Sequence, residues 1–343
     1  MAKMDFAEAL RKDIGENDCN QDVSAWLDTG LLPLNFIISG DYNGGLPMGR
    51  LTEISGGEST GKTMLATQIM LSTQRLGGAA MMLDYEHAFS LRRAVGLGLN
   101  TDPNHWIYKQ PVTAEEGFGI IEKFVARVQE FNVTRPLTVV VDSVASMQTN
   151  DELESSFEKL SNMKTKLSLP AFLSGGLKKL VALVNANNIT VIFINQLRDK
   201  PGVLFGDKEG TPGGRALRFY ASTRIKLGKM GKEKDASGKV IGERVIAKVT
   251  KNKVHEPMGV VEYIASYKEG INMYASHINA LQAMGMFGST KGWLELDGVK
   301  YRKADLEVAL RADQLLYERM LGMFDSSLTP PEPEIEVGTE GDE

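Results

Sequence analysis

Eight consecutive residues near position 60 have the spacing of a phosphate-binding loop, G-x-x-x-x-G-K-[ST]. Glycines let a backbone wrap around a polyphosphate, so that several N–H groups point inward as donors. Lys62 offers positive charge to the β- and γ-phosphates, and Thr63 offers a hydroxyl to Mg²⁺. The motif predicts a nucleoside triphosphate with magnesium as the ligand. Its members are Gly56, Gly57, Glu58, Ser59, Thr60, Gly61, Lys62 and Thr63.

A chance turn rich in glycine and serine is the alternative interpretation of this motif. The flanking residues argue against chance. Residues 49–54 are typical of a short strand, and Lys62 to Leu76 is typical of a helix with apolar Leu65 and Ile69. A helix that begins at the loop directs the positive end of its dipole at the phosphates.

Three polar residues at or after the ends of apolar runs are candidates for chemistry at the γ-phosphate. Asp142 ends the run 137–141 and is suited to the Mg²⁺ shell, the alternative being a cap of the next helix. Glu86 could polarise the attacking water, and a solvated surface glutamate is an equal alternative. Gln196 could contact the γ-phosphate and transmit its presence to the following loop, or it could merely cap its strand.

The fold class follows from the alternation of apolar runs with helical patterns. Residues 114–131 and 171–184 have helical spacing between the runs. Such alternation predicts an α/β fold in which helices flank a mostly parallel sheet, with ligands at the carboxyl ends of the strands. Later apolar segments follow one another without long helices, and we expect them to extend the sheet in antiparallel fashion. These segments are 223–227, 244–249 and 260–266.

The chain is expected to divide into a core with smaller parts on both sides. Residues 1–28 are predicted to form a separate N-terminal segment with a short helix over 6–14, and 29–271 to form the nucleotide-binding core. A helix at 274–286, a hairpin around Asp297-Gly298 and a helix at 304–323 predict a small C-terminal α/β domain over 272–328. Two polar stretches, 151–168 and 198–215, fit no element, and loops of that length are usually functional.

Composition sets further bounds on the function. No apolar run approaches the ~18 residues of a membrane span, and a single cysteine, Cys19, excludes an intrachain disulfide. We expect a cytoplasmic protein. The net charge is −5, but residues 329–343 hold six acidic residues and no basic one, which leaves 38 acidic against 39 basic residues elsewhere. This acidic tail is predicted to be disordered, and it either aids solubility or competes with nucleic acid for basic loops.

Several runs taken together resemble the bacterial RecA-type family of DNA strand-exchange recombinases. The similarity in order and spacing extends from about residue 29 to 323, and divergence within it is compatible with a phage-encoded member. The matching runs are 44–50, 86–88, 140–145, 193–198, 213–222, 251–253 and 269–272.

The resemblance implies that residues 1–28 are an oligomerisation segment and that residues 29–271 are an ATPase core with an ATP site. Glu86 would be the general base, Thr63 and Asp142 would hold Mg²⁺, and Gln196 would sense the γ-phosphate beside Lys62. Lys251 and Lys253 would reach across a subunit interface to the ATP of the neighbour, in the manner of arginine fingers. Tyr267 would contact the base or sugar, and Arg93 stands where the family usually has a stacking tyrosine.

The resemblance also implies DNA as a partner. Filaments on single-stranded DNA would pair it with homologous double-stranded DNA, in DNA recombination, repair and the damage response. Loops 151–168 and 198–215 would line the filament axis, with single-strand-binding and loader proteins as further partners and no membrane. The positions implied to contact DNA are Ser174, Lys178, Arg198, Thr211, Gly213, Gly214 and Arg215.

Some positions depart from the family pattern. The N-terminal segment is short, the first DNA loop is longer, and Ala171 replaces an expected arginine. Of a family basic cluster, Lys229 and Lys248 match, whereas Gly228 and Ile246 do not.

Two other functions compete with this interpretation. One rival function is a hexameric motor of the same fold, such as a replicative helicase or clock-type ATPase. The other is a DNA scaffold or mediator that binds ATP without useful hydrolysis.

Overall fold

The computed structural model describes residues 23–156, 158–159, 167–199, 209–235, 237–287 and 292–326. Across these residues the largest element is a nine-stranded sheet with the order β13-β12-β11-β10-β3-β7-β6-β4-β5. In chain order its strands are β3 (Leu51–Gly56), β4 (Ala79–Asp84), β5 (Trp106–Lys109), β6 (Leu137–Asp142), β7 (Ile189–Gln196), β10 (Thr223–Lys234), β11 (Val240–Asn252), β12 (Val260–Ser266) and β13 (Gly270–Asn272).

The strands from β10 to β5 are all parallel to their neighbours, whereas β11, β12 and β13 are antiparallel. The α/β class with a mostly parallel sheet is therefore confirmed. One expectation was wrong, because residues 223–227 were expected to join the sheet antiparallel. They belong to β10, which pairs parallel with β3. The chain between β7 and β10 includes α9 (Ala216–Tyr220), and such a crossover returns the chain to the same end of the sheet.

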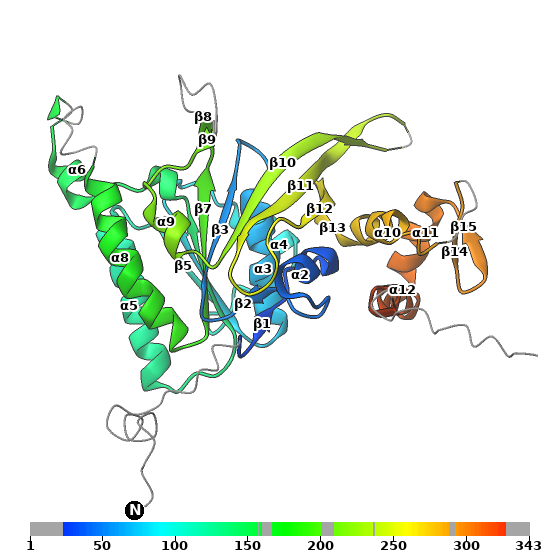
Figure 1. Cartoon of the computed structure of the whole chain (residues 1–343), viewed down its shortest axis with the longest axis horizontal. Coiled ribbons are helices and arrows are strands. Elements are labelled where there is room, and N and C mark those ends of the chain that lie inside the picture. Colours follow the sequence, from blue (N-terminus) through cyan, green and yellow to red (C-terminus); the bar gives the residue numbers. More distant parts are fainter. Residues whose placement is uncertain are drawn as a thin grey trace, which may run out of the picture.

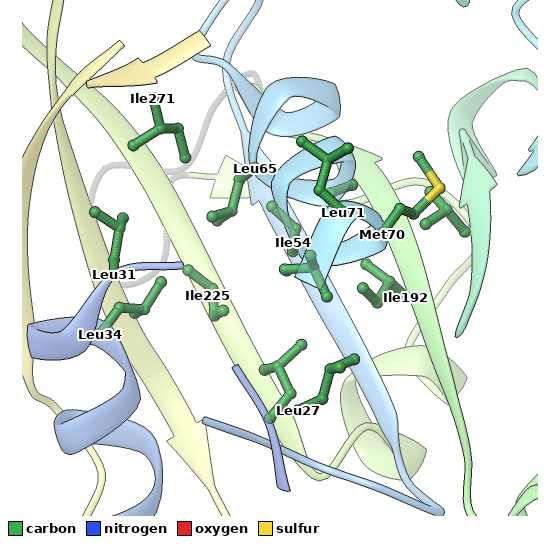
Figure 2. Packing of buried hydrophobic residues seen from close by; sticks show 14 of the residues in the cluster. Leu27, Leu31, Leu34, Ile54, Leu65, Met70, Leu71, Ile192, Ile225 and Ile271 are labelled. Carbon is green, nitrogen blue, oxygen red and sulfur yellow. The ribbon is translucent and has the colours of Figure 1, made fainter. Parts of the chain in front are cut away.

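Helices cover both faces of the sheet (Figure 1). One face packs against α2 (Leu32–Ser39), α3 (Lys62–Arg75) and α4 (Leu91–Gly96), and the other against α5 (Ala114–Glu130), α8 (Ser168–Asn185) and α9. The apolar runs explain this arrangement, since alternate side chains of one strand point to opposite faces. On β6, Val140 belongs to the first core and Val139 and Val141 to the second. Figure 2 shows the first core, where Ile54 of β3 lies between Leu65 of α3 and Ile192 of β7 in the view drawn.

The C-terminal part has a hydrophobic cluster of its own. Its elements are α10 (Met273–Ala283), β14 (Leu294–Leu296), β15 (Val299–Tyr301), α11 (Lys303–Ala312) and α12 (Gln314–Ser326). The hairpin β14–β15 occurs where the Asp297-Gly298 turn predicts it. A single helix over 304–323 was expected, and this was wrong, because the chain leaves the helical conformation at Asp313 (φ −127°, ψ 103°). The Asp313 carboxylate instead accepts a hydrogen bond from the N–H of Leu316 at 3.0 Å and caps α12.

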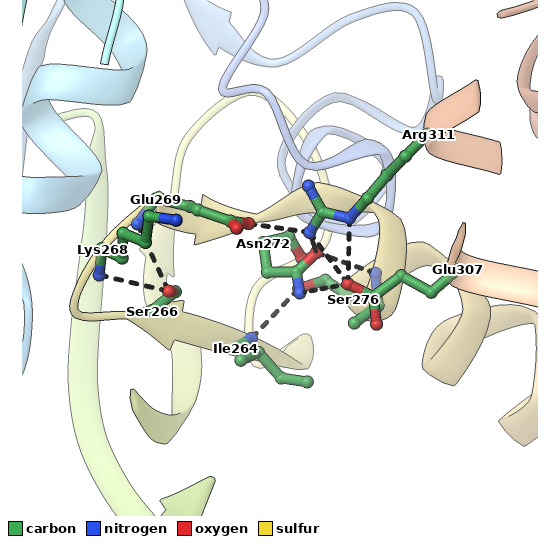
Figure 3. A network of polar contacts seen from close by, with 9 residues as sticks. Ile264, Ser266, Lys268, Glu269, Asn272, Ser276, Glu307 and Arg311 are labelled. Carbon is green, nitrogen blue, oxygen red and sulfur yellow. Dashed lines mark hydrogen bonds and ion pairs between the residues drawn. The ribbon is translucent and has the colours of Figure 1, made fainter. Parts of the chain in front are cut away.

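Figure 3 shows the polar network that joins this C-terminal part to the sheet. Arg311 of α11 donates to the carboxylates of Glu269 (2.7 Å) and Glu307 (2.8 Å) and to the side-chain oxygen of Asn272 (3.2 Å). Glu269 and Asn272 lie around β13, at the edge of the central sheet. The C-terminal elements are thus fixed to the sheet by charged hydrogen bonds as well as by apolar packing.

Short elements occur in the stretches for which no structure was expected. At the start of 151–168, α6 (Asn150–Glu154) follows the 3₁₀ helix η1 (Val144–Ser146), and Thr149 and Glu152 form a capping box at the start of α6. In 198–215, β8 (Arg198–Asp199) pairs with β9 (Glu209–Gly210). Strand β1 (Trp26–Leu27) pairs with β2 (Leu46–Pro47). The helix expected over 6–14, the acidic tail 329–343, and residues 157, 160–166 and 200–208 lie outside the described residues.

Candidate active site

The carboxyl ends of β3, β7, β6 and β4 meet at one edge of the sheet, because these strands are parallel neighbours. A cavity of about 430 Å³ lies at this edge. It is lined by the phosphate-binding loop from Glu58 to Thr63 together with Glu86, Asp142 and Gln196. Arg93 and Tyr267 line it as well. The fold therefore brings the residues predicted for one nucleotide site into one cavity.

The phosphate-binding loop leads from β3 into α3. Gly61 stands at the start of the helix with φ +85°, a conformation that a residue with a Cβ adopts only at a cost. Lys62 turns its ammonium group back onto the loop, where Nζ donates to the carbonyl oxygens of Gly56 (3.2 Å) and Gly57 (2.7 Å). Burial lowers the pKa of Lys62, while the nearby carboxylates of Asp142 and Glu86 oppose that effect. The lysine charge is thus available beside the loop N–H groups.

The residues predicted to hold magnesium are in direct contact. Thr63 Oγ1 donates to Asp142 Oδ2 at 2.6 Å, and Asp142 is 6% exposed. Burial raises the pKa of Asp142 to about 6. A hydroxyl and a carboxylate are the hard oxygen ligands that Mg²⁺ prefers, so the pair fits this ion. Among the described residues no group of three or more His, Cys, Asp or Glu side chains could hold a metal, so phosphate and water would complete the shell.

Glu86 is held by two side chains from neighbouring strand ends. Ser143, just after β6, donates from Oγ to Glu86 Oε1 at 2.5 Å, and Gln196 donates from Nε2 to the same oxygen at 2.9 Å. The candidate base and the candidate sensor are therefore hydrogen-bonded to each other. The sequence did not single out Ser143, although it follows Asp142 directly at a strand end.

Asp84, at the end of β4, is the residue that shapes the turn before α4. Its buried carboxylate accepts hydrogen bonds from the hydroxyl of Tyr108 (2.8 Å) and from the N–H groups of Ala88 (3.4 Å) and Phe89 (3.0 Å). Glu86 lies inside this turn. We conclude that Asp84 positions Glu86 at the cavity.

A second set of side chains at the cavity comes from α4, β11 and the residue after β12, namely Arg93, Glu243 and Tyr267. Arg93 Nη2 donates to the carbonyl oxygen of Tyr267 (3.3 Å), and the Tyr267 hydroxyl donates to Glu243 Oε1 (2.7 Å). Lys232 Nζ lies 2.5 Å from the same oxygen. The sequence analysis did not identify Glu243 or Lys232, because only the cross-strand register of β10 and β11 places them together.

Lys251 and Lys253 do not line the cavity. Lys251 lies near the end of β11, where its Nζ donates to the carbonyl oxygens of Arg218 (2.8 Å) and Phe219 (2.7 Å) of α9. The Lys253 ammonium lies 5.9 Å from the centre of the Phe219 ring. Burial, followed by the charges of Lys253 and Arg224, lowers the pKa of Lys251 to about 8. Two lysines thus gather beside an aromatic ring that is 70% exposed.

The residues predicted to contact DNA lie on α8 and on the segment between β9 and α9. Ser174 and Lys178 are exposed and one turn apart on α8, and Ser174 and Arg215 both line a cavity of about 320 Å³. Thr211, Gly213 and Gly214 follow β9. Arg198 begins β8, and nothing further is described of its side chain. The pairing of β8 with β9 brings the start of the loop 198–215 beside its residues 209–210.

Comparison with known proteins agrees with this arrangement. The sequence model of the RecA N-terminal domain matches residues 4–272, which is most of the chain. The chain belongs to the RecA family. Protein RecA of Chlorobium chlorochromatii is 36% identical over 317 residues, covering 92% of this chain and 85% of that protein. Protein RecA of Geobacter sulfurreducens is 37% identical over 293 residues, covering 85% of this chain and 82% of that protein.

A third relative shows similar coverage. Protein RecA of Chloroherpeton thalassium is 36% identical over 297 residues, covering 86% of this chain and 78% of that protein. The predicted family is thereby confirmed, and membership supports nucleotide and DNA binding in DNA recombination and repair. No helix in the described part of the chain is long and apolar enough to cross a membrane.

Proposed function

We propose that this member of the RecA family is an ATP-dependent DNA recombinase. It forms helical filaments on single-stranded DNA, pairs that strand with homologous duplex, exchanges strands and hydrolyses ATP when DNA is bound. The observation that supports the proposal best is the shared cavity. The phosphate-binding loop, the Thr63–Asp142 pair and the Glu86–Gln196 pair line one space at the carboxyl edge of the sheet. The site would work in the cytoplasm with ATP and Mg²⁺.

The residues on the phosphate side have distinct tasks in this proposal. The loop N–H groups and Lys62 bind the triphosphate, and Thr63 and Asp142 would hold Mg²⁺, which would supply positive charge to the phosphates. For Lys62 to reach a phosphate, its Nζ exchanges the carbonyl oxygens of Gly56 and Gly57 for phosphate oxygens. A bond from the ammonium group to an anionic phosphate oxygen is stronger than a bond to a neutral carbonyl, because both partners are charged.

Glu86 takes the proton of the attacking water in this proposal. Ser143 and Gln196 both donate to Glu86 Oε1 and so fix the orientation of this carboxylate. If Gln196 turns its amide to the γ-phosphate, Glu86 Oε1 loses one of these donors and can accept a hydrogen bond from the attacking water instead. Sensing of the γ-phosphate and activation of the base are therefore linked through a single hydrogen bond.

The proposed function also requires contacts with DNA and with neighbouring protomers. Backbone N–H groups and cations around loops 151–168 and 198–215 bind phosphates without reading sequence. Residues 1–28 contact the next protomer, residues 272–328 form the C-terminal domain, and residues 329–343 form a disordered acidic tail. Lys251 and Lys253 face the ATP of the next protomer, as a head-to-tail contact requires. Single-strand-binding and loader proteins are the further partners.

The decisive experiment combines electron microscopy with an ATPase assay. With ATP, Mg²⁺ and single-stranded DNA we expect open helical filaments and hydrolysis that depends on the DNA. Closed rings would favour the hexameric motor. Filaments without stimulated hydrolysis would favour the scaffold, and Glu86→Gln is the variant that should convert the wild-type protein to that behaviour.

A further inference from the structure

Glu53 is a carboxylate without exposed surface in the middle of the central sheet. It lies on β3, the strand that leads into the phosphate-binding loop. A buried carboxylate is costly unless it is paired and fully hydrogen-bonded. No step proposed for ATP hydrolysis uses Glu53, so the groups that hold it indicate what it does.

Side chains from both neighbouring strands bind the Glu53 carboxylate. On one side, Arg224 of β10 lies in register with Glu53, and its Nε donates to Oε2 at 2.5 Å. On the other side, the buried Asn195 of β7 donates from Nδ2 to Oε1 at 3.1 Å. The Arg224 side chain is only 14% exposed. Each carboxylate oxygen is therefore bound from a different strand.

Asn195 connects Glu53 to both the nucleotide cavity and the loop 198–215. Asn195 Oδ1 accepts a hydrogen bond from the backbone N–H of Gln196 at 3.0 Å, and Gln196 lines the cavity. Asn195 Nδ2 also donates to the carbonyl oxygen of Pro212 at 3.3 Å. Pro212 lies in the segment that returns from the loop 198–215 to the core. A shift of either segment therefore moves the amide that binds Glu53.

Arg224 connects Glu53 to the region around Lys251. Arg224 is the cross-strand partner of Lys251 in the β10–β11 register. Lys251 in turn holds the carbonyl oxygens of α9, the helix that follows the same loop. Arg224 repels the Lys251 ammonium and Glu53 attracts it, as the direction of their effects on the Lys251 pKa shows. The position and charge of Glu53 therefore bear on Lys251.

We propose that Glu53 is a positioning residue that couples the nucleotide cavity of one protomer to its DNA loop and to its Lys251 surface. The inference rests on the proposed function and names the residue through which its parts communicate. One carboxylate holds Asn195 and Arg224 together, so that movement at the cavity is transmitted to both. Glu53 is not a catalytic residue, since it does not line the cavity.

Glu53→Gln is the variant that tests this coupling with the least change in size. Both partners of Glu53 are donors, and a glutamine offers one acceptor oxygen and one NH₂ group. In this variant an NH₂ group must face either Arg224 or Asn195, and both of these are donors. Residue 53 can then no longer bind both partners at once. Glu262→Gln is the matched control, because it removes the exposed Arg244–Glu262 pair (3.1 Å) from the same sheet.

The measurement is the fluorescence anisotropy of labelled oligothymidylate, titrated with and without ATPγS. For the wild-type protein and for Glu262→Gln we expect ATPγS to tighten DNA binding by roughly tenfold or more, within the usual range of coupling. For Glu53→Gln we expect less than about threefold tightening, with ATPγS binding in the absence of DNA changed by less than about threefold. Thermal melting verifies that each variant is folded.

The double variant Glu53→Gln/Arg224→Met separates coupling from stability. Arg224 left beside a neutral glutamine is a buried charge without its partner, which destabilises the fold, and removing both charges relieves this. We expect the double variant to melt near the wild-type temperature and still to respond weakly to ATPγS. If Glu53→Gln alone does not fold, the double variant decides the test.

The possible results are distinct. A wild-type response to ATPγS in Glu53→Gln, or in the folded double variant, would overturn the inference and leave the proposed function intact. Loss of the response in Glu262→Gln as well would also overturn it, because any disturbance of the sheet would then have the same effect. A wild-type protein whose DNA affinity ignores ATPγS would overturn the proposed function, and the inference with it.

Discussion

Hydrolysis at a site shared between two protomers predicts rescue between two inactive variants. Within one chain, Lys251 is in register with Arg224, and Arg224 is in register with Glu53, three residues before Gly56. With a rise of about 3.3 Å per residue and strands about 4.8 Å apart, the Cα atoms of Lys251 and Gly56 are separated by roughly 14 Å. The Lys251 ammonium also points to the carbonyl oxygens of α9. In the proposed function Lys251 therefore assists a nucleotide bound by a neighbour.

The perturbation is an equal mixture of Lys251→Ala and Glu86→Ala proteins. Each variant alone should lose at least about 10²-fold in DNA-stimulated hydrolysis, because the base or the cation is missing from every site. In a mixed filament a site works when its own protomer supplies Glu86 and the next supplies Lys251. Random order gives this arrangement at one neighbour pair in four, so about a quarter of the wild-type rate should return.

The assay measures ATP hydrolysis on single-stranded DNA while the ratio of the two variants is changed at constant total protein. The rate should be highest near the equal mixture and fall toward both pure variants. The control mixture combines Lys251→Ala with the double variant Glu86→Ala/Lys251→Ala, in which no protomer supplies the lysine, and it should stay inactive. A rate in the first mixture equal to the sum of the separate variants would refute the shared site.

Three further predictions concern charge, backbone and tail. Burial lowers the pKa of Lys251 to about 8, so stimulated hydrolysis should fall to about half at pH 8 and to about a tenth at pH 9, and Lys251→Arg should flatten this profile. The unfolded chain holds the Lys251 proton more tightly. The contribution of Lys251 to the free energy of unfolding should therefore rise from pH 8 to pH 10.5, which thermal melting measures. Gly213→Ala should lower the free energy of unfolding by more than about 2 kcal/mol, because φ is +83° and a Cβ would lie 2.7 Å from Leu173 Cδ1. The control Gly77→Ala has φ +75° but no atom close to the new Cβ, so it should lower the free energy of unfolding by only about 1–2 kcal/mol. Truncation after Leu328 should speed duplex DNA binding at low salt, where six carboxylates repel phosphates over ~10 Å, and equal rates for both forms would contradict it.

The strands that carry the site were predictable because their signals are local. A run such as 137–142 is apolar on both faces and ends in a carboxylate, which is typical of a buried parallel strand beside a ligand. The phosphate-binding loop needs certain residue types at fixed spacing, so it also identifies itself in the sequence. From these two signals the convergence of Asp142 and Gln196 on one cavity followed without knowledge of the full topology.

Other features depend on contacts between distant residues or on signals that were overlooked. Glu243 enters the cavity wall only because β11 pairs with β10 and β12, and no spacing within β11 announces that register. Glu53 looks like an interruption of an apolar strand, and its partners lie 142 and 171 residues away. The helix α6 was different, because the capping-box spacing of Thr149 and Glu152 was present in the sequence.

The hydrogen bonds at the cavity explain how ATP could change the state of the whole chain. Lys62 is bound to loop carbonyls, and Gln196 is bound to Glu86, so a triphosphate must replace bonds that already exist. Both existing bonds already involve a charged group, so each exchange contributes only the difference between two bonds of about 1.5–3 kcal/mol. Moving a two-state equilibrium from 1:99 to 99:1 requires about 5.5 kcal/mol. Lys62 and Gln196 therefore supply only part of such a shift, and contacts of the triphosphate with the loop N–H groups must supply the rest. A diphosphate, which offers Gln196 no γ-phosphate, leaves the bond to Glu86 in place.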